Sequence, residues 1–286
     1  MMAIVLPWHS NPSWKPIQFR RFETGMGTSM RTARVVTDAG HAYLKAMGPH
    51  ESPQLLAVEF VTTRLAQWFR LPVLDFGIIE IDAEIDEIPL GVNILARSGP
   101  AFVSRAIDAH TWGGSSAELD SLANAHDIGR LVVFDTWVRN CDRFSESLTR
   151  TRTKLDNVLL EHLTGDDTGK LRLIAMDHTH CFTCGRELDR TLNHMRMVRD
   201  ASLFGLFPGF VPFVRQGDVE AATADLLTVD EEFVHRLTDE IPDQWLVRAD
   251  IRQAWAELIC RRADFVARNV LPAFAAKCWP NKLFDC

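Results

Sequence analysis

The sequence predicts an α+β protein with two lobes, a small mixed N-terminal lobe and a larger, mainly helical C-terminal lobe. Three observations support this. Two runs of β-type residues flank a turn at residues 38–40. A long amphipathic helix and a further strand then follow. From residue 118 onward, apolar residues recur mainly at helical spacing. We expect residues 1–95 to form an N-terminal arm and the small lobe, and residues 96–286 to form the helical lobe.

The composition is typical of a globular protein and argues against some classes of function. Hydrophobic residues make up 47% of the 286 residues and charged residues 24%. No window has the roughly 18 uninterrupted apolar residues of a membrane helix, and the N-terminus lacks the features of a signal peptide. We therefore expect a cytoplasmic protein without a membrane partner. The formal net charge of −7 argues against a general nucleic-acid binder. The six scattered cysteines are expected to be reduced thiols.

The N-terminal third alternates between strands and one helix. Residues 1–21, rich in Pro and Trp, are predicted to be irregular. A β-hairpin with strands at residues 34–37 and 41–47 follows, and alternation places Lys45 on the same face as Tyr43.

A helix is predicted over residues 51–72. Ser52 can cap it and Pro53 suits its first position. Apolar residues at three- and four-residue spacing give one buried stripe, and Glu59 lies beside that stripe. Residues 76–81 then predict another strand.

The C-terminal part opens with a predicted helix over residues 118–138, which ends at a polar cluster. Residues 144–156 are a polar, basic insertion. Two short strands, at residues 157–163 and 171–177, then flank a turn at residues 165–169. The remainder of the chain is predicted to be mainly helical.

The run LFGLFPGFVPF, residues 203–213, interrupts the helical remainder. We favour a plug that fills the core of the helical lobe. The alternative is an exposed docking surface for a partner protein.

The hairpin after the insertion carries the most informative pattern. Its turn centres on Asp167, and Asn157 and Asp177 each lie ten residues from that centre. Symmetric pairing would place these two residues opposite each other across the ladder. Their oxygen atoms could then share one Mg²⁺ ion. Asp142 lies upstream in an irregular loop, and phosphoryl transfer needs this set of two metal ligands and one carboxylate that orients the nucleophile.

Several motifs together resemble the HipA-like kinase family, distant relatives of protein kinases. The runs FDTWVRNCDR, NVLL and IAMDHTHCF look like the family's catalytic segment. GMGTSM is similar to its phosphate-covering loop, AYLKAM to its lysine strand, LLAVEFVTTRLAQWFRLPV to its glutamate-bearing helix, and the late segment IPDQW also matches. The resemblance covers residues 22–250. It implies a two-lobed, protein-kinase-like fold that uses ATP and Mg²⁺.

The resemblance also implies a set of nucleotide-binding residues. Lys45 would hold the nucleotide phosphates and pair with Glu59, while two glycines would give the covering loop backbone freedom. The full nucleotide set is Gly25, Gly27, Thr28, Ser29, Lys45 and Glu59.

Catalytic roles are implied in the same way. Asp142 would be the catalytic base, Asn140 would anchor its loop, and Asn157 and Asp177 would bind the metal. Two departures are clear. The phosphate-covering loop lacks the family's usual proline after its glycines and has Met30 or a neighbour instead. Kinase catalytic loops follow the pattern D-x-x-x-x-N, whereas fourteen residues separate Asp142 from Asn157 here. The insertion 144–156 either projects as a substrate-contacting loop or means that Asn157 is misassigned.

The phosphoryl acceptor and the rival functions stay open. Known family members phosphorylate serine or threonine in proteins, so the resemblance implies a protein substrate, and a regulatory protein partner is also left open. A small-molecule phosphotransferase is one rival. A catalytically inactive pseudokinase, with a site broken by the insertion, is the other.

Less specific interpretations compete with single motifs. Lys45 could be a solvated edge lysine, and Asn157 and Asp177 could cap a hairpin. Residues 177–184, DHTHCFTC, contain zinc-ligand types, but a structural zinc site normally draws on two separated ligand pairs. We therefore favour the phosphoryl-transfer interpretation.

Overall fold

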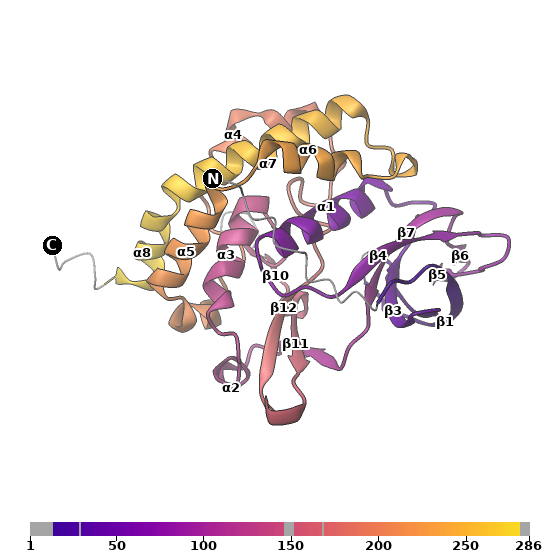
Figure 1. Cartoon of the computed structure of the whole chain (residues 1–286), viewed down its shortest axis with the longest axis horizontal. Coiled ribbons are helices and arrows are strands. Elements are labelled where there is room, and N and C mark those ends of the chain that lie inside the picture. Colours follow the sequence, from indigo (N-terminus) through magenta and orange to yellow (C-terminus); the bar gives the residue numbers. More distant parts are fainter. Residues whose placement is uncertain (1–13, 29, 146–151, 168, 281–286) are drawn as a thin grey trace. The chain divides into compact units, whose positions relative to one another are not determined.

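The computed structural model describes residues 14–28, 30–145, 152–167 and 169–280 (Figure 1). The chain divides into two compact units. Unit 1 comprises Met1–Leu56 and Leu74–Ala106, and unit 2 comprises Ala57–Val73 and Ile107–Cys286. Helix α1, Gln54–Trp68, contains the boundary between them. None of the helices within the described ranges is long and apolar enough to cross a membrane.

Unit 1 is built on a five-stranded antiparallel sheet in the order β1-β2-β3-β7-β4. Its strands are β1 Phe19–Gly25, β2 Ala33–Thr37, β3 Gly40–Lys45, β4 Phe76–Ile81 and β7 Gly99–Arg105, with a separate pair, β5 Pro89–Gly91 and β6 Ile94–Leu95. The predicted hairpin is confirmed, since Thr37 pairs with Gly40 around a two-residue turn. The strand at 76–81 is confirmed as well.

Residues 19–21 differ from the prediction of an irregular arm. They begin β1, which pairs with β2 through two register irregularities. Phe19 is buried in the core of unit 1, with Val35, Leu44 and Val103 among its members. Alternation failed to show this strand because its register shifts break the period of two.

Unit 2 contains a three-stranded sheet in the order β12-β11-β8 and most of the helices. The strands are β8 Ala109–Thr111, β11 Val158–His162 and β12 Leu171–Ala175, with the short pair β9 Phe144–Ser145 and β10 Arg152–Thr153. The helices are α2 Ser116–Asp120, α3 Asp127–Val138, α4 Met195–Val198, α5 Gln216–Leu226, α6 Glu231–Asp239, α7 Ala249–Asn269 and α8 Leu271–Cys278.

The single helix predicted over residues 118–138 is wrong in its first half. The structure has α2, a connecting segment and then α3. In that segment Asn124 donates to the Leu173 carbonyl (3.1 Å) and accepts from the Leu173 amide (2.9 Å). The Ala123 amide likewise donates to the Leu171 carbonyl (2.8 Å). These hydrogen bonds to β12 replace helical ones, so tertiary pairing overrides local periodicity here.

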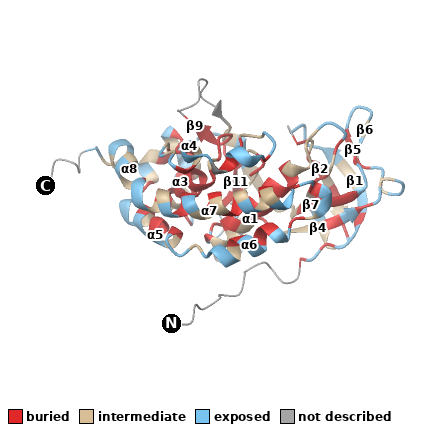
Figure 2. Cartoon of the chain, turned by 90° about the horizontal axis from the view of Figure 1, so that it is seen from above, coloured by how far each residue is buried: buried red, intermediate tan, exposed pale blue. Residues whose placement is uncertain are grey.

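Helix α3 forms the centre of unit 2 (Figure 2). All of its residues except Arg130 are buried, and it packs against α5 and α7. Arg262, fully buried on α7, donates to the Thr136 and Trp137 carbonyls at the C-terminal end of α3. Burial lowers the pKa of Arg262 to about 9. Since four carbonyls at a helix end lack intrahelical partners, this arginine satisfies two of them.

The apolar run 203–213 is a core plug, as predicted. Phe204, Phe207 and Phe210 are each at most 1% exposed. Phe207 and Phe210 pack edge-to-face, with ring centroids 5.0 Å apart. This segment therefore stabilises unit 2 from inside.

Candidate active site

The site is built on the loop that follows α3. Helix α3 ends where Arg139 adopts a left-handed conformation (φ 53°). Asn140 is fully buried and its amide nitrogen donates to Asp135 Oδ1 (3.1 Å), while its Oδ1 accepts from the Asp142 backbone amide (3.4 Å). Asn140 thus ties the loop carrying Asp142 to the last turn of the helix.

The Asp142 carboxylate is buried and faces three side chains. Its Oδ2 accepts from Lys154 Nζ at 2.7 Å and from Asn157 Nδ2 at 3.3 Å, and His180 Nδ1 lies 3.6 Å away. Lys154 lies on the insertion and was not predicted from sequence. The signal that could have identified it is a basic residue three positions before Asn157. The contact with Asn157 joins two residues that the insertion separates in sequence.

The hairpin register differs by one residue from the symmetric one predicted. The last ladder pair is Val158 with Ala175, and Leu163 and Lys170 close the turn, so the centre lies between residues 166 and 167. Asn157 ends the 3₁₀ turn Leu155–Asn157 just before β11, so it does not pair with Asp177 across the ladder. The loop contains an even number of residues, folded partly as the 3₁₀ turn Gly165–Asp167, which shifts the centre by half a residue.

Asp177 lies just beyond the ladder and leaves β geometry, with a φ of 56°. Its Oδ1 accepts from the Thr179 hydroxyl (3.1 Å), and that hydroxyl also lies 3.2 Å from His180 Nδ1. Asp is one of the residues that tolerate a left-handed conformation. Thr179 and His180 therefore connect the two carboxylates: the Thr179 hydroxyl bonds to Asp177, and His180 lies near both that hydroxyl and Asp142.

A buried ion pair supports the site from behind. Arg143 Nε donates to Asp135 Oδ2 at 2.7 Å, and both side chains are 0% exposed. Burial raises the pKa of Asp135, while Arg143 and Asn140 act in the opposite direction. Gly205 (φ 76°) lies against this carboxylate, and a Cβ there would overlap it. From the sequence, Asp135 is expected either to bond to the loop's backbone or to be an ordinary helix-face carboxylate; its carboxylate instead bonds to the Asn140 and Arg143 side chains. Arg143 and Gly205 are supporting residues that the sequence motifs did not single out.

Glu59, in unit 2, lies against the segment after Asp177. Its Oε2 accepts from the His178 backbone amide (2.8 Å), and the side chain is buried. Thr63, one turn along α1, donates to the Glu59 carbonyl (2.7 Å) and lies 3.2 Å from His178 Nδ1. Lys45 lies in unit 1 on β3, and its pairing with Glu59 stays a prediction.

The predicted phosphate-covering loop connects β1 to β2 in unit 1. Gly25 ends β1, and Gly27 has a φ of 65°, which favours glycine. The Thr28 hydroxyl accepts from the Thr32 amide and donates to the Thr32 hydroxyl, both at 2.9 Å. Ser29 lies outside the described residues. These two hydrogen bonds join Thr28 to Thr32 on the β2 side of the loop.

Thiols lie beside the site but do not form a metal centre. Among the residues that the structure describes, no three His, Cys, Asp or Glu side chains are grouped to hold a metal ion. The Cys141 thiol donates to the His180 carbonyl (3.6 Å). A hydrogen bond with Cys184, together with burial, raises the pKa of Cys141, and burial raises that of Cys181.

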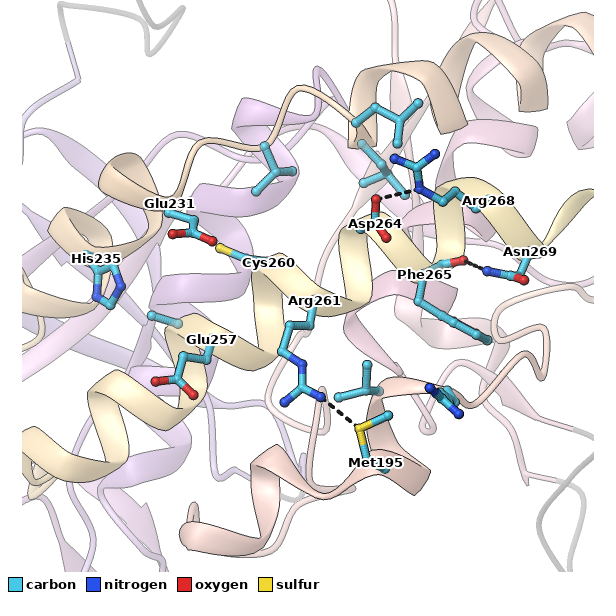
Figure 3. Close-up of a pocket in the computed structure, with 16 residues that line it drawn as sticks. Met195, Glu231, His235, Glu257, Cys260, Arg261, Asp264, Phe265, Arg268 and Asn269 are labelled. Atoms are coloured by element: carbon cyan, nitrogen blue, oxygen red, sulfur yellow. Dashed lines mark hydrogen bonds and ion pairs between the residues drawn. The ribbon is translucent and has the colours of Figure 1, made fainter.

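A separate cavity of about 780 Å³ runs along α7 (Figure 3). Its lining mixes acidic, basic and apolar side chains, among them Glu231, Arg261 and Phe265. Figure 3 shows Arg261 bonded to Met195 and Arg268 to Asp264. None of the predicted site residues lines this cavity, so it takes no part in the chemistry predicted for Asp142.

Comparisons with known proteins identify the family and the fold. The family described as HipA-like kinase matches residues 20–270. A proinflammatory kinase from Helicobacter pylori, CtkA, is similar in structure, with a TM-score of 0.56 and 10% identity over 92% of this chain and 99% of that one. Fam20 from hydra, solved with sugar, has a TM-score of 0.51 and 10% identity over 94% of this chain and 88% of that one. These likenesses confirm the predicted kinase-like fold. No curated protein sequence matches.

Proposed function

Since this chain belongs to the HipA-like kinase family and is a phosphotransferase, we propose that it transfers the γ-phosphoryl group of ATP to serine or threonine hydroxyls of a protein. Asp142 is the catalytic base in this proposal, and Asn157 and Asp177 hold Mg²⁺. The observation that carries it is the hydrogen bond between Asn157 and the buried Asp142 carboxylate.

The contact between Asp142 and Asn157 bears directly on the inactive alternative. A pseudokinase broken by its insertion should have Asn157 displaced from Asp142. Instead Asn157 Nδ2 lies 3.3 Å from Asp142 Oδ2, despite fourteen intervening residues. The contact therefore supports an active enzyme. The insertion makes the chain between Asp142 and Asn157 longer than in D-x-x-x-x-N, but the two side chains still meet.

The donor set fits a magnesium ion. Because the Asn157 amide nitrogen donates to Asp142, its amide oxygen is the atom left to bind a cation. Asp177 supplies a carboxylate, and Mg²⁺ prefers oxygen ligands and takes few of them from protein. When bound, the ion neutralises the charge on the transferring phosphate.

Asp142 orients the acceptor hydroxyl and takes its proton. Asn140 holds its backbone and Lys154 lies against its carboxylate, so the acceptor side of the site is fixed before substrate arrives. The Lys154 ammonium also places a positive charge where the phosphoryl group carries negative charge in the transition state.

Nucleotide binding is assigned to the residues that the family resemblance implies. Lys45 would contact the phosphates and pair with Glu59, and the loop with Gly25, Gly27 and Thr28 would cover them. Two features of the loop support this assignment. The Thr28 hydroxyl accepts a hydrogen bond from the Thr32 backbone amide, and Gly27 supplies a residue in the left-handed conformation.

A labelling experiment tests the proposal. The purified protein is incubated with γ-labelled ATP, Mg²⁺ and a cell extract, and the labelled species are separated and hydrolysed to phosphoamino acids. We expect label on serine or threonine, lost when Asp142→Asn replaces the wild type. Label recovered only in small molecules would overturn the acceptor class. ATP bound without any transfer would overturn the activity.

A further inference from the structure

Arg143, directly after Asp142, is a fully buried charge beside the site. A buried guanidinium is costly unless it is paired and its donors are satisfied. The Asp135 carboxylate supplies the pair at 2.7 Å. Asp135 alone would satisfy the charge, so the remaining donors of Arg143 indicate what else the residue does.

Those donors close the end of the β11–β12 hairpin. Arg143 Nη1 donates to the Asn157 carbonyl, and Nη2 donates to the Met176 carbonyl at 3.3 Å. Asn157 directly precedes Val158, and Met176 directly follows Ala175, the two residues of the last ladder pair. A side chain therefore bridges the two strands at the point where backbone pairing stops.

The two carbonyls belong to functionally placed residues. One is that of Asn157 itself, and the other precedes Asp177 directly. The guanidinium is planar and rigid, so it fixes the two backbones at one spacing, as a flexible ammonium could not. The same plane is anchored to α3 through Asp135, next to Asn140.

We propose that Arg143 is a positioning residue that sets the separation of the two metal ligands, Asn157 and Asp177, and ties both to the loop of Asp142. The inference rests on the proposed function, because it assumes that these two residues bind Mg²⁺. The proposal predicts that loss of the Arg143 guanidinium lowers the Mg²⁺ affinity by more than a loss of folding stability alone would explain.

The test is Arg143→Lys, which keeps a positive charge beside Asp135 but cannot bridge both carbonyls. The matched control is Arg262→Lys. Arg262 is also fully buried and also bonded to backbone carbonyls, but at the end of α3 and near Asp200 rather than at the hairpin. Calorimetry measures Mg²⁺-dependent ATP binding by each variant, and melting scans measure stability.

We expect both variants to melt below the wild type, with Arg143→Lys alone weakening the Mg²⁺ affinity in the ATP complex. Residues that orient metal ligands typically affect affinity by roughly 10- to 100-fold. The half-maximal Mg²⁺ concentration for turnover should rise by a similar factor.

Equal Mg²⁺ affinity in Arg143→Lys and the wild type would overturn the positioning role, as would an equal loss in Arg262→Lys. Should Arg143→Lys fail to fold, the double variant Asp135→Asn with Arg143→Gln removes both charges and is measured instead, with the same expectation. Wild-type protein that binds MgATP without transferring phosphate would overturn the proposed function, and the binding data would still decide the role of Arg143. Wild-type protein that binds no Mg²⁺ would overturn both.

Discussion

Asp142→Asn removes one negative charge from the centre of the site with almost no change in volume. The wild-type carboxylate accepts from Lys154 and from Asn157, and the loop backbone is held separately by Asn140. We expect this variant to fold and to bind MgATP nearly as the wild type does, while losing most phosphoryl transfer.

The expected loss of stability is small. Lys154 is 39% exposed, so its pair with Asp142 is screened by solvent and contributes about 0–1 kcal/mol. Changing the hydrogen bond to Asn157 costs about 0.5–1.5 kcal/mol. A total of about 1.5 kcal/mol lowers Tm by roughly 3–6 °C.

The expected loss of activity is far larger. General base assistance contributes roughly 10²–10⁴-fold, or about 3–5 kcal/mol of barrier. Stability and activity therefore separate in this variant, which distinguishes a catalytic role from a structural one.

The assay pairs turnover with calorimetry and a melting scan. The control is Asp127→Asn, another buried carboxylate of unit 2, which accepts from Asn124 (2.9 Å) away from the site. Its turnover should stay within a few-fold of the wild type. If Asp142→Asn abolishes MgATP binding, or if both variants lose activity equally, the assignment of Asp142 as the base is refuted.

Three further outcomes are expected. Saturating MgATP should stabilise the wild type, by about 2.7 kcal/mol at a hundredfold excess over Kd. Asp177→Asn should reduce this stabilisation because it removes a metal-binding charge. An equal stabilisation of the variant in melting scans would contradict the role of Asp177 as a metal ligand. Gly205→Ala should destabilise by roughly 2 kcal/mol or more in urea unfolding, since its Cβ overlaps Asp135 at a left-handed φ, whereas Gly217→Ala, in open space on α5, should be neutral or stabilising. Backbone N–H groups lower the pKa of Asp38 below 3.8, so the contribution of the Asp38 carboxylate to folding stability is complete above pH 3.8 and is lost as the pH falls through the lowered pKa. The difference in unfolding free energy between the wild type and Asp38→Asn should therefore shrink in acid. A difference that stays constant down to pH 2 would contradict this.

Local patterns alone predicted three of the five sheet strands of unit 1, helix α1 and the β11–β12 hairpin, but not β1, β7 or β8. Alternation predicted β2, β3 and β4, and the apolar spacing predicted α1. These elements follow from side-chain periodicity within one segment, which requires no knowledge of distant residues. The hairpin pattern and the family resemblance together gave the candidate roles of Asp142, Asn157 and Asp177, which stay predictions until tested.

Only the tertiary structure decided the features that depend on residues far apart in the chain. The helix predicted over residues 118–138 breaks because Asn124 bonds to Leu173, 49 residues away. Lys154 reaches Asp142 across the insertion, and Arg143 reaches both Asn157 and Met176. Periodicity carries no information on such contacts, because a hydrogen bond between distant segments depends on where the whole chain places its donor and acceptor. The hairpin register shows the same limit, since a turn centre shifted by half a residue removes the predicted pairing of Asn157 with Asp177.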